Sequence, residues 1–206
     1  EEHFAFDQIV NDGIWAGSKT QLIDNLELGK YLFEVIDIKT NKPIYSRGFC
    51  SIYGEWETTP EAKENWGVYH ESLRFPWPKN EAKLILHKRK DEDQKFYKIW
   101  EYKVKSNSWR AADAYANKFE SIDILNNGEP SKKVDIVILS EGYTNDDMAK
   151  YKKDAQAFAD ALMETEPFAS RITDFNIKAV KVPSPMSGVH HPHQDIYTRS
   201  ALSVRY

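Results

Sequence analysis

The sequence has little of three things: cysteine, excess positive charge and long apolar runs. Its one cysteine, Cys50, cannot form a disulfide within the chain, so stability must come from core packing. Lys and Arg number 28 against 32 Asp and Glu, a net charge of −4, which argues against a protein that grips nucleic-acid phosphates. No apolar run approaches the roughly 20 residues of a membrane-spanning helix. We therefore expect neither a nucleic-acid partner nor a membrane span.

Several catalytic motifs are also absent. The sequence holds no Walker loop, no G-x-G-x-x-G and no paired cysteines. A zinc-peptidase helix needs H-E-x-x-H, because that spacing puts both imidazoles on one helical face with the glutamate near the metal-bound water. The nearest match is His70-Glu71, but Arg74 stands where the second histidine belongs. We therefore assign no catalytic residue to this chain.

Aromatic side chains are abundant, and most of them precede residue 120. They make up 13% of the sequence and favour the half-buried surfaces of sheets. Asn41 and Pro43 supply the turn of a hairpin between the runs 32–38 and 44–49. Further strands are expected at 67–75, 82–88 and 96–104, and an exposed loop with a helical turn at 57–65. Short strands at this spacing predict an N-terminal antiparallel β-sandwich over residues 1–118.

The pattern changes after residue 118. A strand is predicted over 119–125, and the apolar run 134–139, broken only by Asp135, is typical of a strand covered on both faces. Thr144 is placed to cap a helix that extends to Glu164. The apolar stripe of this helix, with steps of three or four, comprises Met148, Tyr151, Ala155, Phe158, Ala159 and Leu162. With a further strand over 175–182, the order predicts a β-α-β unit. The chain is therefore expected to have two domains of α+β class, the second covering residues 119–206.

The loop after the run 134–139 is the first candidate site. Ser140 resembles a nucleophile elbow only in part, because that motif needs glycine two residues to either side and Ile138 replaces the first one. The simpler interpretation is that Gly142 permits the turn. Loops at the carboxyl ends of strands are where α/β folds place ligands, so this loop is expected to line a cleft.

A second candidate is the only local histidine cluster, His190, His191 and His193, with Asp195 nearby. Three imidazoles so close can bind a transition metal. Pro192 restricts the backbone between them, and the polar residues upstream indicate an exposed loop. We favour a solvated loop with accidental metal affinity and keep the metal site as the alternative.

A third candidate is a set of tryptophans near predicted loops, Trp56, Trp66 and Trp77. Exposed indoles in loops can stack on sugar rings or anchor a protein partner. Core packing is the commoner role of tryptophan. A non-catalytic protein- or glycan-binding module is therefore the alternative function for the β-rich part.

Residues 134–189 carry a family resemblance. The string Val134–Thr144 (V-D-I-V-I-L-S-E-G-Y-T), followed by Pro167-Phe168, Phe175-Asn176-Ile177 and Ser187-Gly188-Val189, resembles the opening of the catalytic domain in the IgA peptidase family of zinc metallopeptidases. The β-rich stretch before it is similar in position to the N-terminal domain of many members. The resemblance implies a zincin-like fold, zinc in a full-length member, a protein or peptide substrate such as immunoglobulin or another host or surface protein, and export to the bacterial periplasm, cell surface or medium.

The same resemblance sets limits on activity. Members carry their H-E-x-x-H helix well downstream of the S-G-V segment, and this sequence stops at Tyr206. We therefore expect the chain as given to be the N-terminal portion of a peptidase, to hold no cofactor and to be inactive. Glu141, Tyr143, Ser187 and Gly188 are expected nearest the substrate cleft. An incomplete α/β domain leaves strand edges without partners, which favours self-association.

Overall fold

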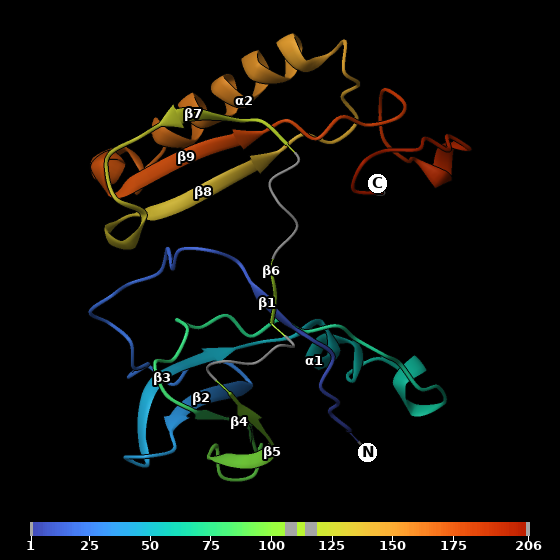
Figure 1. Cartoon of the computed structure of the whole chain (residues 1–206). Coiled ribbons are helices and arrows are strands. Elements are labelled where there is room, and N and C mark those ends of the chain that lie inside the picture. The colour runs from blue at the N-terminus through green and yellow to red at the C-terminus, as the bar shows by residue number, and fades with distance from the viewer. Residues whose placement is uncertain (1, 106–110, 114–118, 205–206) are drawn as a thin grey trace. The chain divides into compact units, whose positions relative to one another are not determined.

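The computed structural model describes residues 2–105, 111–113 and 119–204 (Figure 1). The chain divides into two compact units, Glu1–Ala114 and Tyr115–Tyr206, called unit 1 and unit 2 below. The predicted domain boundary after residue 118 lies at the edge of residues 114–118, which are outside the described residues, so it stays a prediction. None of the helices that the described residues form has the length and apolar character needed to cross a membrane.

Unit 1 is built on a four-stranded antiparallel sheet. Its strands are β2 (Tyr31–Asp37), β3 (Lys42–Phe49), β4 (Ala82–Arg89) and β5 (Phe96–Val104), in the order β3-β2-β4-β5. These are four of the five runs from which strands were predicted, and the hairpin turn is where it was expected. Two short strands, β1 (Ile9–Asn11) and β6 (Ala111–Asp113), pair in parallel. The antiparallel β-structure of this part is therefore confirmed.

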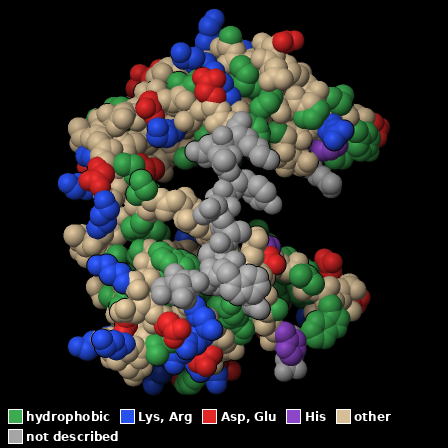
Figure 2. Space-filling model, in the orientation of Figure 1, with side chains coloured by type: hydrophobic (Ala, Val, Ile, Leu, Met, Phe, Trp, Pro, Cys, Tyr) green, Lys and Arg blue, Asp and Glu red, His purple; other side chains and the backbone are tan. Residues whose placement is uncertain are grey.

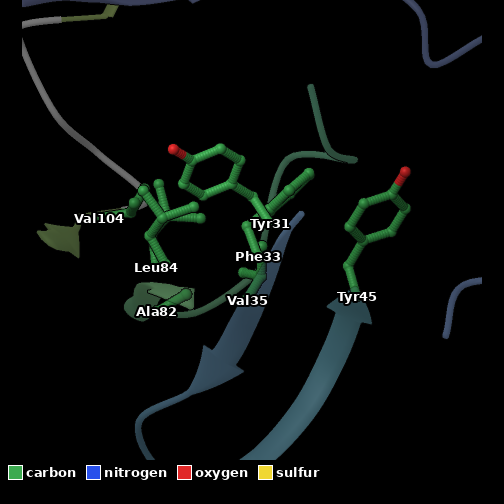
Figure 3. Close-up of a cluster of buried hydrophobic side chains, with 8 residues drawn as sticks. Tyr31, Phe33, Val35, Tyr45, Ala82, Leu84 and Val104 are labelled. Carbon is green, nitrogen blue, oxygen red and sulfur yellow. The ribbon is translucent and has the colours of Figure 1, made fainter. Parts of the chain in front are cut away.

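The core of unit 1 lies on one face of this sheet (Figure 3). Tyr31, Phe33 and Val35 alternate along β2 and are buried with residues of the neighbouring strands. Among the described residues, loop side chains such as Trp15 and Phe75 pack against this cluster. The other described sheet of this unit is the two-stranded pair of β1 and β6, so the sandwich is not confirmed.

The strand predicted over residues 67–75 is not formed. Val68 is 99% exposed, while Leu73 and Phe75 pack on the core. No ladder forms in this described segment, because Pro76 and Pro78 follow it and lack backbone donors. The segment thus contributes side chains to the core without pairing as a strand.

The N-terminal residues run beside this segment and attach to the sheet. The ring of His3 stacks on Trp66 at 6.4 Å, and Asp7 and Asp12 form ion pairs with His70 and Arg74. Glu2 accepts hydrogen bonds from the Tyr31 hydroxyl and the Lys88 ammonium group. Side chains far apart in the sequence thus hold residues 2–12 in place.

Short helices follow β3. Ser51 caps α1 (Ile52–Trp56) by accepting a hydrogen bond from the Gly54 backbone N–H. The 3₁₀ turn η1 (Glu61–Lys63) lies inside the stretch 57–65, where a helical turn in an exposed loop was predicted, and that prediction is confirmed.

Unit 2 is a three-stranded mixed sheet with one long helix (Figure 1). The strands β7 (Ser121–Leu125), β8 (Val134–Leu139) and β9 (Phe175–Val180) have the order β7-β9-β8. β8 and β9 are parallel and joined through α2 (Met148–Met163), so the β-α-β unit is confirmed. Short 3₁₀ turns lie at η2 (Pro130–Lys132), η3 (Ala169–Asp174) and η4 (Pro192–Gln194). The three strands described in unit 2 do not confirm a zincin-like fold.

The helix α2 covers one face of this sheet. Its buried residues are Tyr151, Ala155, Ala159 and Met163, and they pack on side chains of all three strands. Phe158, which was predicted to lie in the stripe, is 57% exposed because it lies at the margin of that stripe. The helix begins at Met148 rather than at Thr144, since Thr144 and Asp147 form a hydrogen-bonded turn before it.

The prediction that residues 134–139 are covered on both faces is wrong. Ile136 and Ile138 pack beneath α2, whereas Val137 and Leu139 are 55% and 48% exposed. The reason is that α2 covers one face of the sheet, and the side chains of Val137 and Leu139 alternate onto the other face, which no described helix or sheet covers. A continuous apolar run predicts a strand here but does not determine whether both of its faces are covered.

The buried side-chain amide of Asn176 lies near the start of the two parallel strands, β8 and β9. Asn176 is 6% exposed, and its Nδ2 donates to the Gly128 carbonyl and to Asp135 Oδ1, at 3.0 and 2.8 Å. Its Oδ1 accepts from the Asn127 backbone N–H at 2.8 Å. One side chain therefore joins β9, β8 and the turn before β8.

We expect Asn176→Ala to destabilise unit 2 by about 2–4 kcal/mol, because three polar groups lose a partner at a buried position. Hydrogen exchange of the β8 and β9 amides measures this loss. Lys178→Ala is the matched control on the same strand, since its ion pair with Asp123 is about half exposed and is worth under about 1 kcal/mol. Equal effects of the two substitutions would contradict the assigned role of the amide.

Candidate functional site

The candidate site is built from the loops at the carboxyl ends of β8 and β9. Ser140 is fully buried; its Oγ donates to the Val182 carbonyl at 2.7 Å and accepts from the Val182 N–H at 2.6 Å. Both hydrogen-bonding functions of the hydroxyl are thus taken by the backbone. Ser140 joins the two loops and is not placed as a nucleophile.

Glu141 binds a segment that lies far along the sequence. Its carboxylate accepts hydrogen bonds from the Ser200 hydroxyl and from the backbone N–H groups of Leu202 and Val204, the last two at 2.8 and 3.0 Å. Burial raises the pKa of Glu141, but these hydrogen bonds outweigh burial and hold it below its ordinary value of 4.5. The ionised carboxylate therefore fixes the path of residues 200–204.

Gly142 brings the two loops into direct contact. Its φ is +75°, and a Cβ there would lie 2.7 Å from the Gly188 carbonyl oxygen, so a larger residue would separate the loops. The Gly142 N–H donates to Ser184 Oγ, and its carbonyl accepts from the Gly188 N–H, at 2.9 and 2.8 Å. Ser184 Oγ also accepts from the Ala201 N–H at 3.1 Å. Three chain segments meet at this point.

The side chain of Tyr143 is directed to α2. Its hydroxyl donates to Asp154 Oδ2 at 2.8 Å, and the Lys150 ammonium lies 5.2 Å from the ring centre. Burial and the bond to Asp154 raise the pKa of Tyr143, so the phenol is protonated at neutral pH. Its backbone carbonyl accepts from the Ser184 N–H, which keeps the residue in the loop cluster.

The turn before α2 also reaches the second loop. Asp147 Oδ2 accepts from the backbone N–H and the hydroxyl of Thr144, at 3.0 and 2.7 Å. These bonds, and a further one from Ser187, lower the pKa of Asp147. The spacing of three residues between Thr144 and Asp147 was the available sequence signal for this bonded turn.

The four predicted cleft residues thus lie in one cluster of loops. Gly188 contacts Gly142, Ser187 contacts Asp147, and Glu141 and Tyr143 flank Gly142. Their side chains diverge, however, since Glu141 faces residues 200–204 and Tyr143 faces α2. A role in substrate contact stays a prediction.

The three histidines lie in a loop closed by the bridge between His191 and Ile196. His190 Nδ1 accepts from the Thr198 N–H at 3.2 Å, so that nitrogen is directed to the backbone. The rings of His191 and His193 lie edge to face, 5.8 Å apart. Within residues 2–105, 111–113 and 119–204, no group of three His, Cys, Asp or Glu side chains could hold a metal ion.

The tryptophans of unit 1 have different surroundings. Trp56 packs against Tyr53 and Tyr69 at 6.0 and 5.4 Å, whereas Trp66 and Trp77 are 80% and 45% exposed. On the face shown in Figure 2, basic and acidic side chains are interspersed in both units. Of the three tryptophans, Trp66 is the most exposed and is therefore the best placed to contact a partner.

Comparison with known proteins gives two matches. The family model described as "Peptidase M64 N-terminus" matches residues 1–101, and the model described as "IgA Peptidase M64" matches residues 122–206. A search of the curated proteins found no match.

We expect Glu141→Gln to release residues 200–204, because a single amide oxygen cannot accept the hydrogen bonds that the carboxylate accepts. Hydrogen exchange of the Leu202 and Val204 amides should accelerate about tenfold or more. Asp146→Asn, an exposed change in the same loop, is the control and should leave these amides protected.

The same bonds predict a pH dependence. The folded-state pKa of Glu141 is lowered from 4.5, so its contribution is fully present above pH 4.5 and is lost as the pH falls through the lowered value. Protection of the two amides, relative to intrinsic exchange, should follow this change and should not do so in Glu141→Gln. Protection that is independent of pH in the unmodified chain would refute the role of the Glu141 carboxylate in holding residues 200–204.

Proposed function

The chain belongs to the M64 family of peptidases, and from this membership we propose that it is the N-terminal portion of an exported zinc metallopeptidase. The observation that carries the proposal is the order of the two matches, an N-terminal family domain followed by a peptidase domain. The substrate we propose is a protein or peptide, and the family's description suggests an immunoglobulin. Export to the periplasm, cell surface or medium belongs to the same proposal.

Zinc in such an enzyme polarises the scissile carbonyl and activates water. The described residues do not fit this metal, because a catalytic zinc needs three protein ligands and no described group of three candidate side chains could supply them. The sequence also contains no H-E-x-x-H. We therefore derive no catalytic step from this chain and propose that it is inactive alone.

What this chain contributes, in our proposal, is one wall of the substrate cleft. Ligands of α/β sheets bind beyond the carboxyl ends of parallel strands, and the loops after β8 and β9 lie there. Ser140, Gly142 and Ser184 bond these loops to each other. Glu141 positions residues 200–204, and the exposed backbone at Ser187 and Gly188 is left to meet a substrate. A wall held by so many internal bonds would keep its shape when a substrate binds.

The zinc content of two proteins tests the proposal. We expect the 206-residue chain to retain no zinc after dialysis and to leave casein and immunoglobulin A intact. The same chain extended by the sequence encoded after Tyr206 should retain about one zinc per molecule and cleave protein until a chelator is added. An extended protein without stoichiometric metal would refute the proposal, and so would zinc-dependent cleavage by the unextended chain.

A binding role for unit 1 is the second candidate, favoured by the exposure of Trp66. This indole is 80% exposed and lies against His3, while a Cβ at the neighbouring Gly67 would lie 2.7 Å from the Tyr69 ring and 3.1 Å from the Trp56 ring. The anchored backbone therefore presents a large apolar ring to solvent. Such rings are frequent anchors of protein and glycan ligands.

For this role we expect the full chain to bind particular proteins or glycans on an array. Trp66→Ala should weaken that binding about tenfold or more. Tyr97→Ala removes another exposed ring of unit 1, on β5, and should leave binding unchanged. An array without specific binding, or equal binding by Trp66→Ala, would rule out this role.

A further inference from the structure

The turn between β7 and β8 contains the single Asn-Gly pair of the sequence, Asn127-Gly128. An asparagine is most prone to lose its side-chain nitrogen when glycine follows it, because glycine has no Cβ to hinder the approach of its backbone nitrogen to the preceding side chain. Gly128 has a φ of +138°, which other residues rarely adopt, and it is exposed to water. The turn therefore requires the residue that makes Asn127 reactive.

The folded structure holds Asn127 at its backbone and at its side chain. Its backbone N–H donates to Asn176 Oδ1 at 2.8 Å. Its side-chain nitrogen, Nδ2, donates to the carbonyl oxygens of Ile172 and Phe175, each at 2.8 Å. The side-chain amide cannot turn toward the next residue, or release its nitrogen, without breaking both of these bonds.

The backbone nitrogen of Gly128 is held as well. Its N–H donates to Asn126 Oδ1 at 3.2 Å. This nitrogen attacks the preceding side chain only after it has lost its proton, so the hydrogen bond opposes the reaction. The turn thus combines a reactive dipeptide with hydrogen bonds to each group that must move for the dipeptide to react.

We propose that Asn127 is a site of spontaneous deamidation, which the folded turn suppresses and which opening of unit 2 permits. In the open chain the Gly128 nitrogen forms a bond to Asn127 Cγ, and the Cγ–Nδ2 bond breaks. Nδ2 leaves as ammonia with the proton that the Gly128 nitrogen has lost. Water then adds to either carbonyl of the resulting succinimide ring, which yields aspartate or isoaspartate at position 127. The reaction consumes only water and does not depend on the peptidase function.

The product of this reaction does not fit the native turn. A carboxylate at position 127 has no hydrogen to donate, so its oxygens would face the carbonyl oxygens of Ile172 and Phe175 without a bond. Isoaspartate also lengthens the main chain by one carbon at the residue that bonds to Asn176. An opening of unit 2 is therefore reversible until Asn127 reacts and becomes permanent afterwards.

Peptide mapping by mass spectrometry tests the protection in the full chain. At mildly alkaline pH the folded chain should deamidate at Asn127 at least about tenfold more slowly than the same chain in urea, because the reaction proceeds from the open state. Asn176→Ala removes the acceptor of the Asn127 N–H and should accelerate the reaction without urea about tenfold or more. Lys178→Ala on the same strand is the control and should react as slowly as the unmodified chain.

The comparison with urea needs no variant, so it decides the question even where Asn176→Ala does not fold. Equal rates in the folded and the urea-unfolded chain would overturn the proposal. Reaction at Asn126 in place of Asn127 would do the same, and so would equal rates in Asn176→Ala and Lys178→Ala.

A second measurement tests the effect of the product. Asn127→Asp introduces the aspartate product directly, and exchange of the β8 and β9 amides should accelerate about tenfold or more, because two buried donor positions are lost. Asn126→Asp adds the same charge at the exposed neighbouring position and keeps an oxygen that accepts from the Gly128 N–H, so it should leave exchange unchanged. Equal exchange in the two variants would show that the turn tolerates the product and would overturn the proposal.

Discussion

The arrangement of unit 2 depends on how the chain leaves β8. At that point the buried hydroxyl of Ser140 both donates to and accepts from the backbone of Val182, which fixes the loops after β8 and β9 side by side. Gly142 can then approach Gly188, and Glu141 can reach the backbone of residues 200–204. Each of these contacts needs the previous one, because a loop displaced by one residue would leave buried polar groups unpaired.

Local patterns in the sequence predicted the elements of this chain better than their partners. Alternation and apolar runs located β2, β4, β5, β8 and β9, because side-chain period is a property of the segment itself. The strand prediction failed over residues 67–75, where Leu73 and Phe75 pack on the core but no ladder forms in the described segment. Strand pairing depends on contacts between segments that are distant in the sequence, and the pattern within one run of residues does not indicate those contacts.

In the candidate site too, the sequence predicted the local element but not its long-range contacts. The sequence placed Glu141 in a loop at a strand end, but its acceptors are filled by donors that begin 59 residues further along. No local pattern connects these residues, so the expected substrate contact and the observed structural bond could not be distinguished in advance. Similarly, the apolar run of β8 was interpreted as buried on both faces, whereas α2 covers one face of the sheet and Val137 and Leu139 are exposed on the other.

β8 adjoins one region of unit 2 whose polar groups are satisfied internally and carries another whose apolar side chains are exposed. The loops at its carboxyl end satisfy their polar groups internally, and Ser140, Ser184 and Ser200 are buried there. On the face of β8 turned away from α2, by contrast, Val137 and Leu139 are 55% and 48% exposed. Hydration of the backbone costs little, but exposed apolar area is unfavourable. The polar contacts that fix the loops do not depend on how this apolar face is covered, since their hydrogen bonds lie within unit 2.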